Sequence, residues 1–224
     1  MSFKSFLLTL LTNQPKVMQR SEIISRSMEM FVHEGIKSVR MNDIAMQLGV
    51  SKRTLYEQFT NKDELIFEAM ELYFSEKRAT WTTFAQRAAN VVELLFMVLN
   101  HIMEYADTTA RLMDTLKRFH PEVYQRVISE GTKMNQNEFR QMLREGIQQG
   151  MFIPTFNIDL AINVLYYSAS ALVTRKIPLP EGIDDNQAFL HIICTFFRGI
   201  ATAKGMELID QYTHQYDFNQ KTTK

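Results

Sequence analysis

The sequence predicts an all-α fold in which a group of short N-terminal helices precedes a larger domain of long helices. Three observations support this fold class. Apolar residues recur at helical spacing from about residue 20 nearly to the C terminus. Only eight Gly and five Pro punctuate the 224 residues, so long helices can run without interruption. Hydrophobic residues make up 46% of the chain, which is enough to bury a substantial core.

The composition also indicates a cytoplasmic protein without disulfide bonds or a membrane anchor. The single cysteine, Cys194, lies in the apolar run HIICTFFRGI, where we interpret it as a small buried side chain. The lack of a disulfide framework favours a reducing compartment. No uninterrupted apolar run approaches the ~18 to 20 residues that a membrane-spanning helix requires. We therefore expect no membrane partner.

The N-terminal segment 1–19 is predicted to be an arm outside the folded core. Its apolar stretch is short, and no small-x-small cleavage site follows it, so it does not read as a signal peptide. Met18 directly precedes the first helical pattern. We therefore expect residues 1–17 either to form a frayed or docking arm or to lie upstream of the native start.

The run 43–65, DIAMQLGVSKRTLYEQFTNKDEL, has the pattern of two short helices joined by a glycine turn and followed by a third helix with a capped start. Ile44, Ala45 and Leu48 form an apolar set at helical spacing. Gly49 then supplies the left-handed residue that ends the first helix. Two short helices in this order are typical of a helix-turn-helix unit, although a plain amphipathic helix pair gives the same periodicity.

The second helix of this run is predicted to begin at Ser51, whose hydroxyl can accept a hydrogen bond from the backbone N–H near Thr54. Leu55 and Phe59 share its inner face by their i, i+4 spacing. At roughly 100° per residue the outer arc carries a different set of side chains. That set is Arg53, Thr54 and Glu57, with Tyr56 at its edge and Lys52 in the first turn.

The string LGVSKRTLYEQFTNKDEL resembles the helix-turn-helix of the TetR family of one-component transcription regulators, in which Gly-Val-Ser-x-x-Thr-Leu-Tyr-x-x-Phe-x-x-Lys recurs. Upstream residues resemble the first helix of that family and its glycine stop, so the close resemblance covers about residues 20 to 70. Those upstream residues are Ile23, Ile24, Ser27, Phe31, Glu34 and Gly35. The resemblance implies a DNA-binding homodimer whose partners are a double-stranded DNA operator and a small-molecule effector.

The predicted DNA-binding residues are Arg40, Ser51, Lys52, Arg53, Thr54, Tyr56 and Lys62. Arg53 is expected to read a base, because a guanidinium can pair bidentately with guanine O6 and N7; Lys52 is the second choice. The resemblance implies that Thr54 and Tyr56 contact DNA and that Lys62 contacts phosphate. Arg40 replaces the Thr or Ser with which the family often caps its second helix, which leaves a phosphate contact for Arg40 and makes Ser38 a possible substitute cap. For each cation the alternative is a solvated surface charge.

The net charge of zero is unevenly distributed. Residues 1–62 hold nine basic and five acidic side chains, a balance of +4, and the remainder carries −4. A basic N-terminal part attracts phosphate whereas an acidic remainder does not. The excess is modest, which favours two copies acting together on DNA.

The remaining chain is predicted to consist of long helices. One runs from about Lys62 to Phe84, another restarts at Pro121, and a further one begins near Asn157 or Asp159. The last is expected near QAFLHIICTFFRGIATAKG. The resulting domain bounds are 1–19 for the arm, 20–66 for the DNA-binding domain, 67–210 for a helical effector-binding and dimerisation domain, and 211–224 for a C-terminal tail.

The final two predicted helices are apolar around most of their circumference, so they need cover on two sides. One side can be the core of the subunit and the other the same helix pair of a second copy, in an isologous four-helix interface. The predicted dimer residues are Leu160, Val164, Leu172, Phe189, Ile193, Phe196, Phe197 and Ile200.

Met and aromatic side chains of the second domain could line an adaptable apolar pocket for an effector, or could simply form its core. The candidates are Phe96, Met97, Met103, Met113, Phe119, Tyr124, Phe139, Tyr166 and Tyr167. The sequence names no ligand.

An enzyme is not predicted. The chain has no Gly-x-Gly pair, no His-Glu-x-x-His and no Cys-x-x-Cys, and its five His are scattered, so we expect no catalytic residue, metal or cofactor. The predicted function is a repressor released from its operator by a small, largely apolar effector. The alternative is an effector-free architectural or division-related DNA-binding protein on the same fold.

Overall fold

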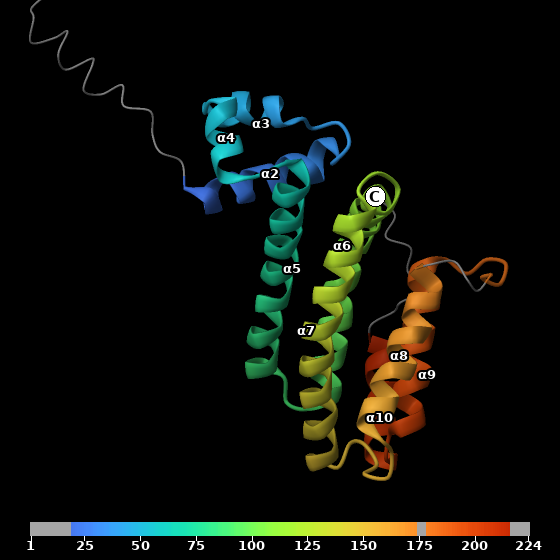
Figure 1. Cartoon of the computed structure of the whole chain (residues 1–224). Coiled ribbons are helices and arrows are strands. Elements are labelled where there is room, and N and C mark those ends of the chain that lie inside the picture. The colour runs from blue at the N-terminus through green and yellow to red at the C-terminus, as the bar shows by residue number, and fades with distance from the viewer. Residues whose placement is uncertain (1–18, 174–177, 216–224) are drawn as a thin grey trace, which may run out of the picture. The chain divides into compact units, whose positions relative to one another are not determined.

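The computed structural model describes residues 19–173 and 178–215, without the side chains of 132–135, 169–173 and 186. Its described residues form helices and no strand, apart from one isolated bridge between Phe152 and Ala201. The predicted all-α fold is therefore confirmed (Figure 1). The helices are α2 (Arg20–Glu34), α3 (Met41–Leu48), α4 (Lys52–Gln58), α5 (Lys62–Arg87), α6 (Val91–Phe119), α7 (Pro121–Gln148), α8 (Ile158–Val173), α9 (Asp185–Ile200) and α10 (Ala203–Gln215).

The chain divides into two compact units, and each unit is made of two separate segments of the sequence. Among the described residues, the first unit contains 19–75 together with 111–127, and the second contains 76–110, 128–173 and 178–215. Helices α5, α6 and α7 each contribute to both units. The predicted domain bounds remain a proposal, and the arm 1–18 and residues 216–224 of the tail lie outside the described residues.

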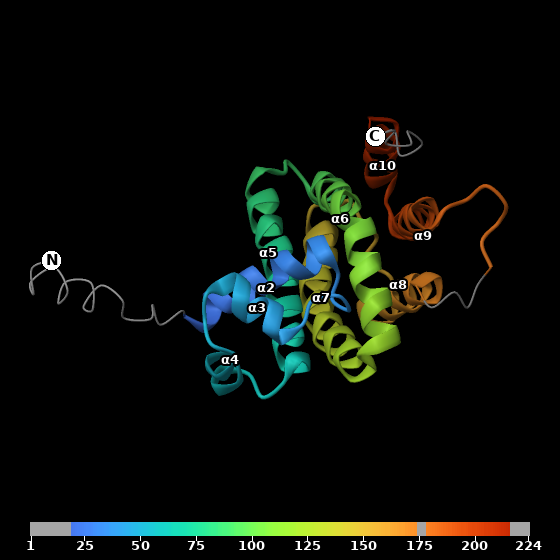
Figure 2. The same cartoon turned by 90° about the horizontal axis from the view of Figure 1, so that it is seen from above.

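The first unit is built around α3, which packs against both α2 and α4 (Figures 1 and 2). The helix ends follow local chemistry. Gly49 adopts φ 65°, a left-handed conformation that favours glycine, and its N–H closes α3 onto the Ala45 and Met46 carbonyls. Side chains with no exposed surface fill the centre of the unit, and six of the large ones come from α2 to α5 and the turn after α4. They are Ile23, Phe31, Ile44, Leu55, Phe59 and Leu65.

The second unit has its own core, formed where α6 and α7 meet the C-terminal helices α8, α9 and α10. Phe152 and Phe197 are almost fully buried there, with ring centroids 5.5 Å apart. The segments that follow α7 and α9 pair across a short contact, in which Ile153 N–H donates to Ile200 O at 2.9 Å and Thr202 N–H donates to Met151 O at 2.9 Å.

The C-terminal helices differ from the prediction at one junction. The segment expected as a single last helix is two helices, α9 and α10, and residues 211–215 of the predicted tail are helical. The break has a local cause, because Ala201 is extended at φ −75° and ψ 146°. The Thr202 hydroxyl then accepts from Gly205 N–H at 3.1 Å and starts α10.

Other predicted helix starts are confirmed. Helix α7 begins at Pro121, and Asn157 Oδ1 accepts from Leu160 N–H at 2.9 Å at the start of α8. Across the described ranges, no helix combines the length and apolarity needed to cross a bilayer. Within the same ranges no cluster of three or more His, Cys, Asp or Glu side chains is arranged to hold a metal ion.

Candidate nucleic-acid interface

Helix α4 is the centre of the predicted interface, and its start is set by Ser51. The Ser51 hydroxyl oxygen accepts from Thr54 N–H at 3.0 Å, which confirms the predicted cap. The two hydroxyl oxygens of Ser51 and Thr54 lie 2.8 Å apart. Leu55 and Phe59 anchor the inner face of α4 in the core. The helix is therefore held so that its outer face is fixed relative to the unit.

The outer face of α4 is charged and exposed. The Arg53 side chain is 87% exposed, and its Nε donates to Glu57 Oε1 at 2.8 Å, one helical turn away. This hydrogen bond raises the pKa of Arg53, so the guanidinium stays charged. Lys52 Nζ lies 5.8 Å from the centroid of the Tyr56 ring, and both side chains are exposed. Three predicted DNA contacts, Lys52, Arg53 and Tyr56, thus share one solvent-facing surface.

Lys62 lies in a different environment from these exposed side chains. Its Nζ donates to the Ile36 carbonyl oxygen at 2.6 Å, which ties the start of α5 to the loop before α3. Burial lowers the pKa of the Lys62 ammonium. Lys62 is therefore partly committed to the fold, and only its remaining N–H groups are free to meet a phosphate.

Arg40 is the N-cap residue of α3, and the open question about this cap has a structural answer. A guanidinium carries no hydrogen-bond acceptor, so the Arg40 side chain cannot cap the helix. Instead the Asp43 carboxylate accepts from the Arg40 backbone N–H at 2.8 Å. Ser38 precedes the N-cap by two residues and is not the substitute cap. The exposed Arg40 side chain remains available to solvent.

Arg20 makes a set of long-range hydrogen bonds, called here the Arg20 clamp, that the sequence did not indicate. Its guanidinium donates to the Glu64 carboxylate at 2.9 Å, to Glu68 through Nε at 3.0 Å, and to the Gln58 carbonyl oxygen. The same group lies 4.1 Å from the centroid of the Phe59 ring. The partners are 38 to 48 residues away in sequence, so no local pattern indicates them. Arg20 joins α2 to α5 and is not a free cation for phosphate.

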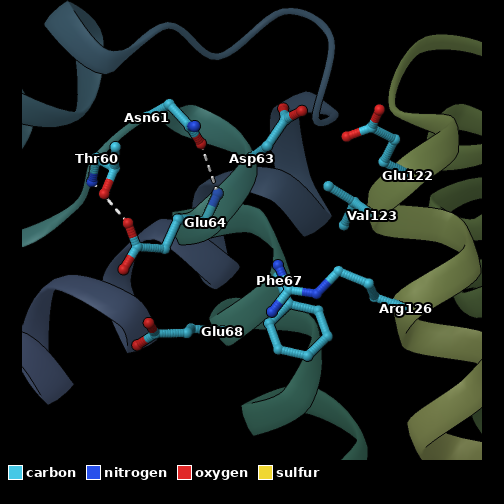
Figure 3. Close-up of a pocket in the computed structure, with 9 residues that line it drawn as sticks. All are labelled: Thr60, Asn61, Asp63, Glu64, Phe67, Glu68, Glu122, Val123 and Arg126. Atoms are coloured by element: carbon cyan, nitrogen blue, oxygen red, sulfur yellow. Dashed lines mark hydrogen bonds between the residues drawn. The ribbon is translucent and has the colours of Figure 1, made fainter.

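Glu64 also organises the start of α5. The Thr60 backbone N–H donates to its carboxylate at 2.6 Å and, with the Thr60 hydroxyl and Arg20, holds the pKa of this carboxyl below its usual range. Asn61 Oδ1 in turn accepts from Glu64 N–H at 2.9 Å. Figure 3 shows both hydrogen bonds at the rim of a cavity of about 470 Å³.

This cavity lies within the first unit, and its lining is acidic. Asp63, Glu64, Glu68 and Glu122 contribute carboxylates, and the Arg126 guanidinium lies 3.8 Å from the centroid of the Phe67 ring (Figure 3). None of the predicted effector residues lines it. An acidic lining of this kind does not favour a DNA phosphate. The charge of the cavity lining is therefore opposite to that of the cationic side chains on α4.

The junction of α6 and α7 belongs to the first unit, which separates three of the predicted effector residues from the others. Met113, Phe119 and Tyr124 were expected in the second domain but fall within 111–127. Phe119 is half exposed, and Lys37 Nζ lies 4.2 Å from its ring centroid. Next to it, His120 Nδ1 is 2.7 Å from Asp63 Oδ1. Helical spacing could not show that this segment packs with the DNA-binding helices.

The other predicted effector residues lie in the second unit, mostly as core. Phe96 is buried and stacks on Tyr212 with centroids 5.6 Å apart, and Phe139 packs against Phe197 at 5.8 Å. Met97, Met103 and Tyr166 are half-buried. Tyr167 is the exception, because it is 69% exposed on α8 and lines no interior space.

Helices α5 and α6 each carry a buried polar atom that the sequence did not single out, and an aromatic contact joins the two helices. The Phe84 and His101 rings meet edge to face at 5.6 Å, and His101 also contacts Tyr105. Trp81 precedes Phe84 by one turn on α5. Trp81 Nε1 and His101 Nε2 are both buried and find no hydrogen-bond partner among the residues that the structure describes. Such atoms usually have a partner in folded proteins.

The predicted dimer residues fall into two groups. Leu160 and Val164 are 62% and 51% exposed on α8, on the same face as Tyr167. In contrast, Ile193, Phe197 and Ile200 are buried in the core of their own subunit, which corrects their assignment to a dimer surface. Phe189 and Phe196 are half-buried, and the Leu172 side chain lies outside the described residues.

A short helix that is capped by serine and presents cations outward from a compact helical unit is the arrangement found in helix-turn-helix DNA-binding proteins. Comparisons with known proteins agree. Residues 23–69 match the family model described as bacterial regulatory proteins, tetR family. The repressor KstR2 of Mycobacterium tuberculosis is 24% identical over 146 residues, which cover 63% of this chain and 73% of KstR2.

Two further comparisons cover more of the chain. The transcriptional regulator YvaF of Bacillus subtilis is 25% identical over 180 residues, covering 80% of this chain and 93% of YvaF. A solved transcriptional regulator from Cytophaga hutchinsonii has the same fold, with a TM-score of 0.68 and 17% identity over 80% of this chain and 97% of that structure. The N-terminal part of the chain thus matches the TetR family of transcriptional regulators, and the named relatives support a DNA-binding regulator.

Proposed function

We propose that this protein is a homodimeric repressor that reads an inverted repeat with helix α4 and leaves it when a small, largely apolar effector binds the second unit. The observation that carries the DNA-reading part is the Arg53 guanidinium on the exposed face of α4. Its reach and fixed fork suit guanine O6 and N7 in the major groove. Lys52 is the second candidate for base reading, and Tyr56 and Arg40 contribute phosphate contacts around it.

The dimer is supported by the apolar face of α8 formed by Leu160, Val164 and Tyr167. Large side chains exposed next to one another in this way are typical of an interface. Two copies also double the number of phosphates that the modest basic excess of the N-terminal part can neutralise. In a two-fold dimer the same face of each copy would meet its equivalent.

The effector is supported by two buried polar atoms, one on α5 and one on α6. Glu104 accepts from His101 Nδ1 at 3.1 Å, which leaves Nε2 of a neutral imidazole as an acceptor, whereas Trp81 Nε1 is a donor. A ligand acceptor satisfies Trp81 Nε1, and a ligand donor satisfies His101 Nε2. We infer an effector with a largely apolar body that carries such an acceptor and donor.

Replacing Arg53 with alanine tests the DNA-reading function. We expect the wild-type protein to prefer the DNA upstream of its own gene over an unrelated duplex, and the variant to lose about 1–3 kcal/mol of discrimination for each half-site. Fluorescence anisotropy over a salt series measures both quantities. Arg26→Ala is the matched control, because Arg26 is an exposed arginine in the surface pair with Glu29 on α2. A preference that survives in Arg53→Ala, or an equal loss in Arg26→Ala, would contradict the proposal.

Replacing Trp81 with phenylalanine tests the effector site, because it removes the N–H and keeps an aromatic ring. The probe is 1-anilinonaphthalene-8-sulfonate, an apolar aromatic body with a strong hydrogen-bond acceptor. We expect the dye to bind the folded wild-type protein and to bind Trp81→Phe about tenfold more weakly. Phe84→Leu, on the same face of α5, is the control for packing. Equal binding by wild type and Trp81→Phe would refute the role of this N–H.

A further inference from the structure

The Arg53 side chain is hydrogen-bonded to Glu57, one turn further along α4. The Arg53 Nε to Glu57 Oε1 distance is 2.8 Å, and the two side chains are 87% and 59% exposed. The pair lies on the outer face, opposite the buried Leu55. A carboxylate at this point is unfavourable for phosphate binding, so electrostatics alone would not place it on a DNA-facing surface.

The geometry of the pair leaves the reading edge of the arginine open. A guanidinium has five N–H groups, and Glu57 occupies the one on Nε. Arg53 makes no other hydrogen bond with the part of the chain that the structure describes. The two terminal nitrogens, Nη1 and Nη2, therefore remain available, and together they can donate to guanine O6 and N7.

We propose that Glu57 is a positioning and specificity residue for Arg53, a proposal that rests on the DNA-reading function above. Its hydrogen bond fixes the direction in which the guanidinium points, so that less side-chain freedom is lost when a guanine is bound. Its negative charge weakens binding to the phosphates of any sequence. Both effects increase the difference in affinity between the correct site and other DNA.

Two substitutions separate these effects. Glu57→Gln keeps an oxygen that can accept from Nε but removes the charge, whereas Glu57→Ala removes both. Both variants should therefore bind an unrelated duplex more tightly, with the slope of log affinity against log salt steeper by about 1. Only Glu57→Ala should also lose base discrimination, by roughly tenfold.

The chain supplies a matched control on α2. Arg26 and Glu29 form an exposed pair at 3.1 Å with side chains 60% and 57% exposed, on a helix that contributes no predicted base contact. Glu29→Ala removes the same charge from the same unit. It should shift binding to the unrelated duplex without changing any base preference.

The experiment is a parallel selection of wild type, Glu57→Ala, Glu57→Gln and Glu29→Ala from one pool of duplexes with randomised centres. Binding of each protein to one unrelated duplex over a salt series accompanies it, and circular dichroism checks that each variant is folded. We expect a guanine position that is enriched by wild type, Glu57→Gln and Glu29→Ala and is weakened in Glu57→Ala.

Three results would overturn the inference, and they differ in what else they affect. An unchanged guanine preference in Glu57→Ala would mean that Glu57 acts only as a surface charge and does not position Arg53. Loss of a cytosine preference in Glu57→Gln would instead make Glu57 a direct base reader. If wild type itself enriches no sequence, the proposed DNA-reading function fails and the inference fails with it.

Discussion

Replacing Val164 with glutamate is expected to turn the proposed dimer into a monomer and to lower operator affinity on the order of a hundredfold or more. Val164 lies between Leu160 and Tyr167 on the exposed face of α8. In a two-fold dimer the substitution would place two carboxylates near the symmetry axis without partners, and burying unpaired charges is costly. A monomer neutralises half as many phosphates and loses the linked second half-site.

Sedimentation velocity measures the mass of this variant, and anisotropy with the DNA selected by wild type measures its affinity. Gln141→Glu is the control, because Gln141 is exposed on α7 and the substitution adds the same charge to the second unit. The control should remain a dimer and keep its affinity. A dimeric Val164→Glu protein would show that the α8 face is not the interface.

Replacing Gly205 with alanine is expected to lower the free energy of unfolding by about 3 kcal/mol, at the upper end of the usual cost of overpacking. A Cβ at this position would lie 2.1 Å from the Met151 carbonyl oxygen. That oxygen accepts from Thr202 N–H at 2.9 Å, so the backbone cannot retreat without breaking a contact between two segments. The clash outweighs the roughly 1 kcal/mol that alanine gains over glycine in a helix.

Thermal unfolding followed by circular dichroism measures the effect of Gly205→Ala, with an expected fall in Tm of roughly 6–12 °C. Gly131→Ala is the control, because Gly131 lies within α7 and a Cβ there meets no atom within 4 Å. The control should be stabilised by about 0.5–1 kcal/mol. If Gly205→Ala unfolds at or above the wild-type temperature, the close approach at this junction does not constrain the fold.

The sequence predicts the helix-turn-helix well because its determinants are local. A capping serine, a left-handed glycine and apolar residues at i, i+4 spacing act over a single turn, and Ser51 and Gly49 behave in the structure as expected. The exposure of Arg53 follows from the same periodicity. Even its pairing with Glu57 is a local i, i+4 relation.

Contacts between residues that are distant in the sequence could not be predicted from local patterns. The Arg20 clamp joins residues that are 44 and 48 positions apart, and Lys62 Nζ donates to the Ile36 carbonyl oxygen. Helices that are apolar on all sides pose a further problem, because periodicity cannot say which side faces the subunit core. That ambiguity placed Phe197 at the dimer surface and Tyr167 in a pocket, whereas Phe197 is core and Tyr167 is exposed.

The most direct test of the proposed mode of binding is the DNA sequence that the wild-type protein selects from a randomised duplex pool. Two copies that each place α4 in a major groove should enrich an inverted repeat, with half-site centres separated by about 34–36 Å or a multiple of that distance. Each half-site should contain a guanine at the position that Arg53 reads. A selected sequence without two-fold symmetry, or no enriched sequence at all, would contradict recognition by a dimer through α4.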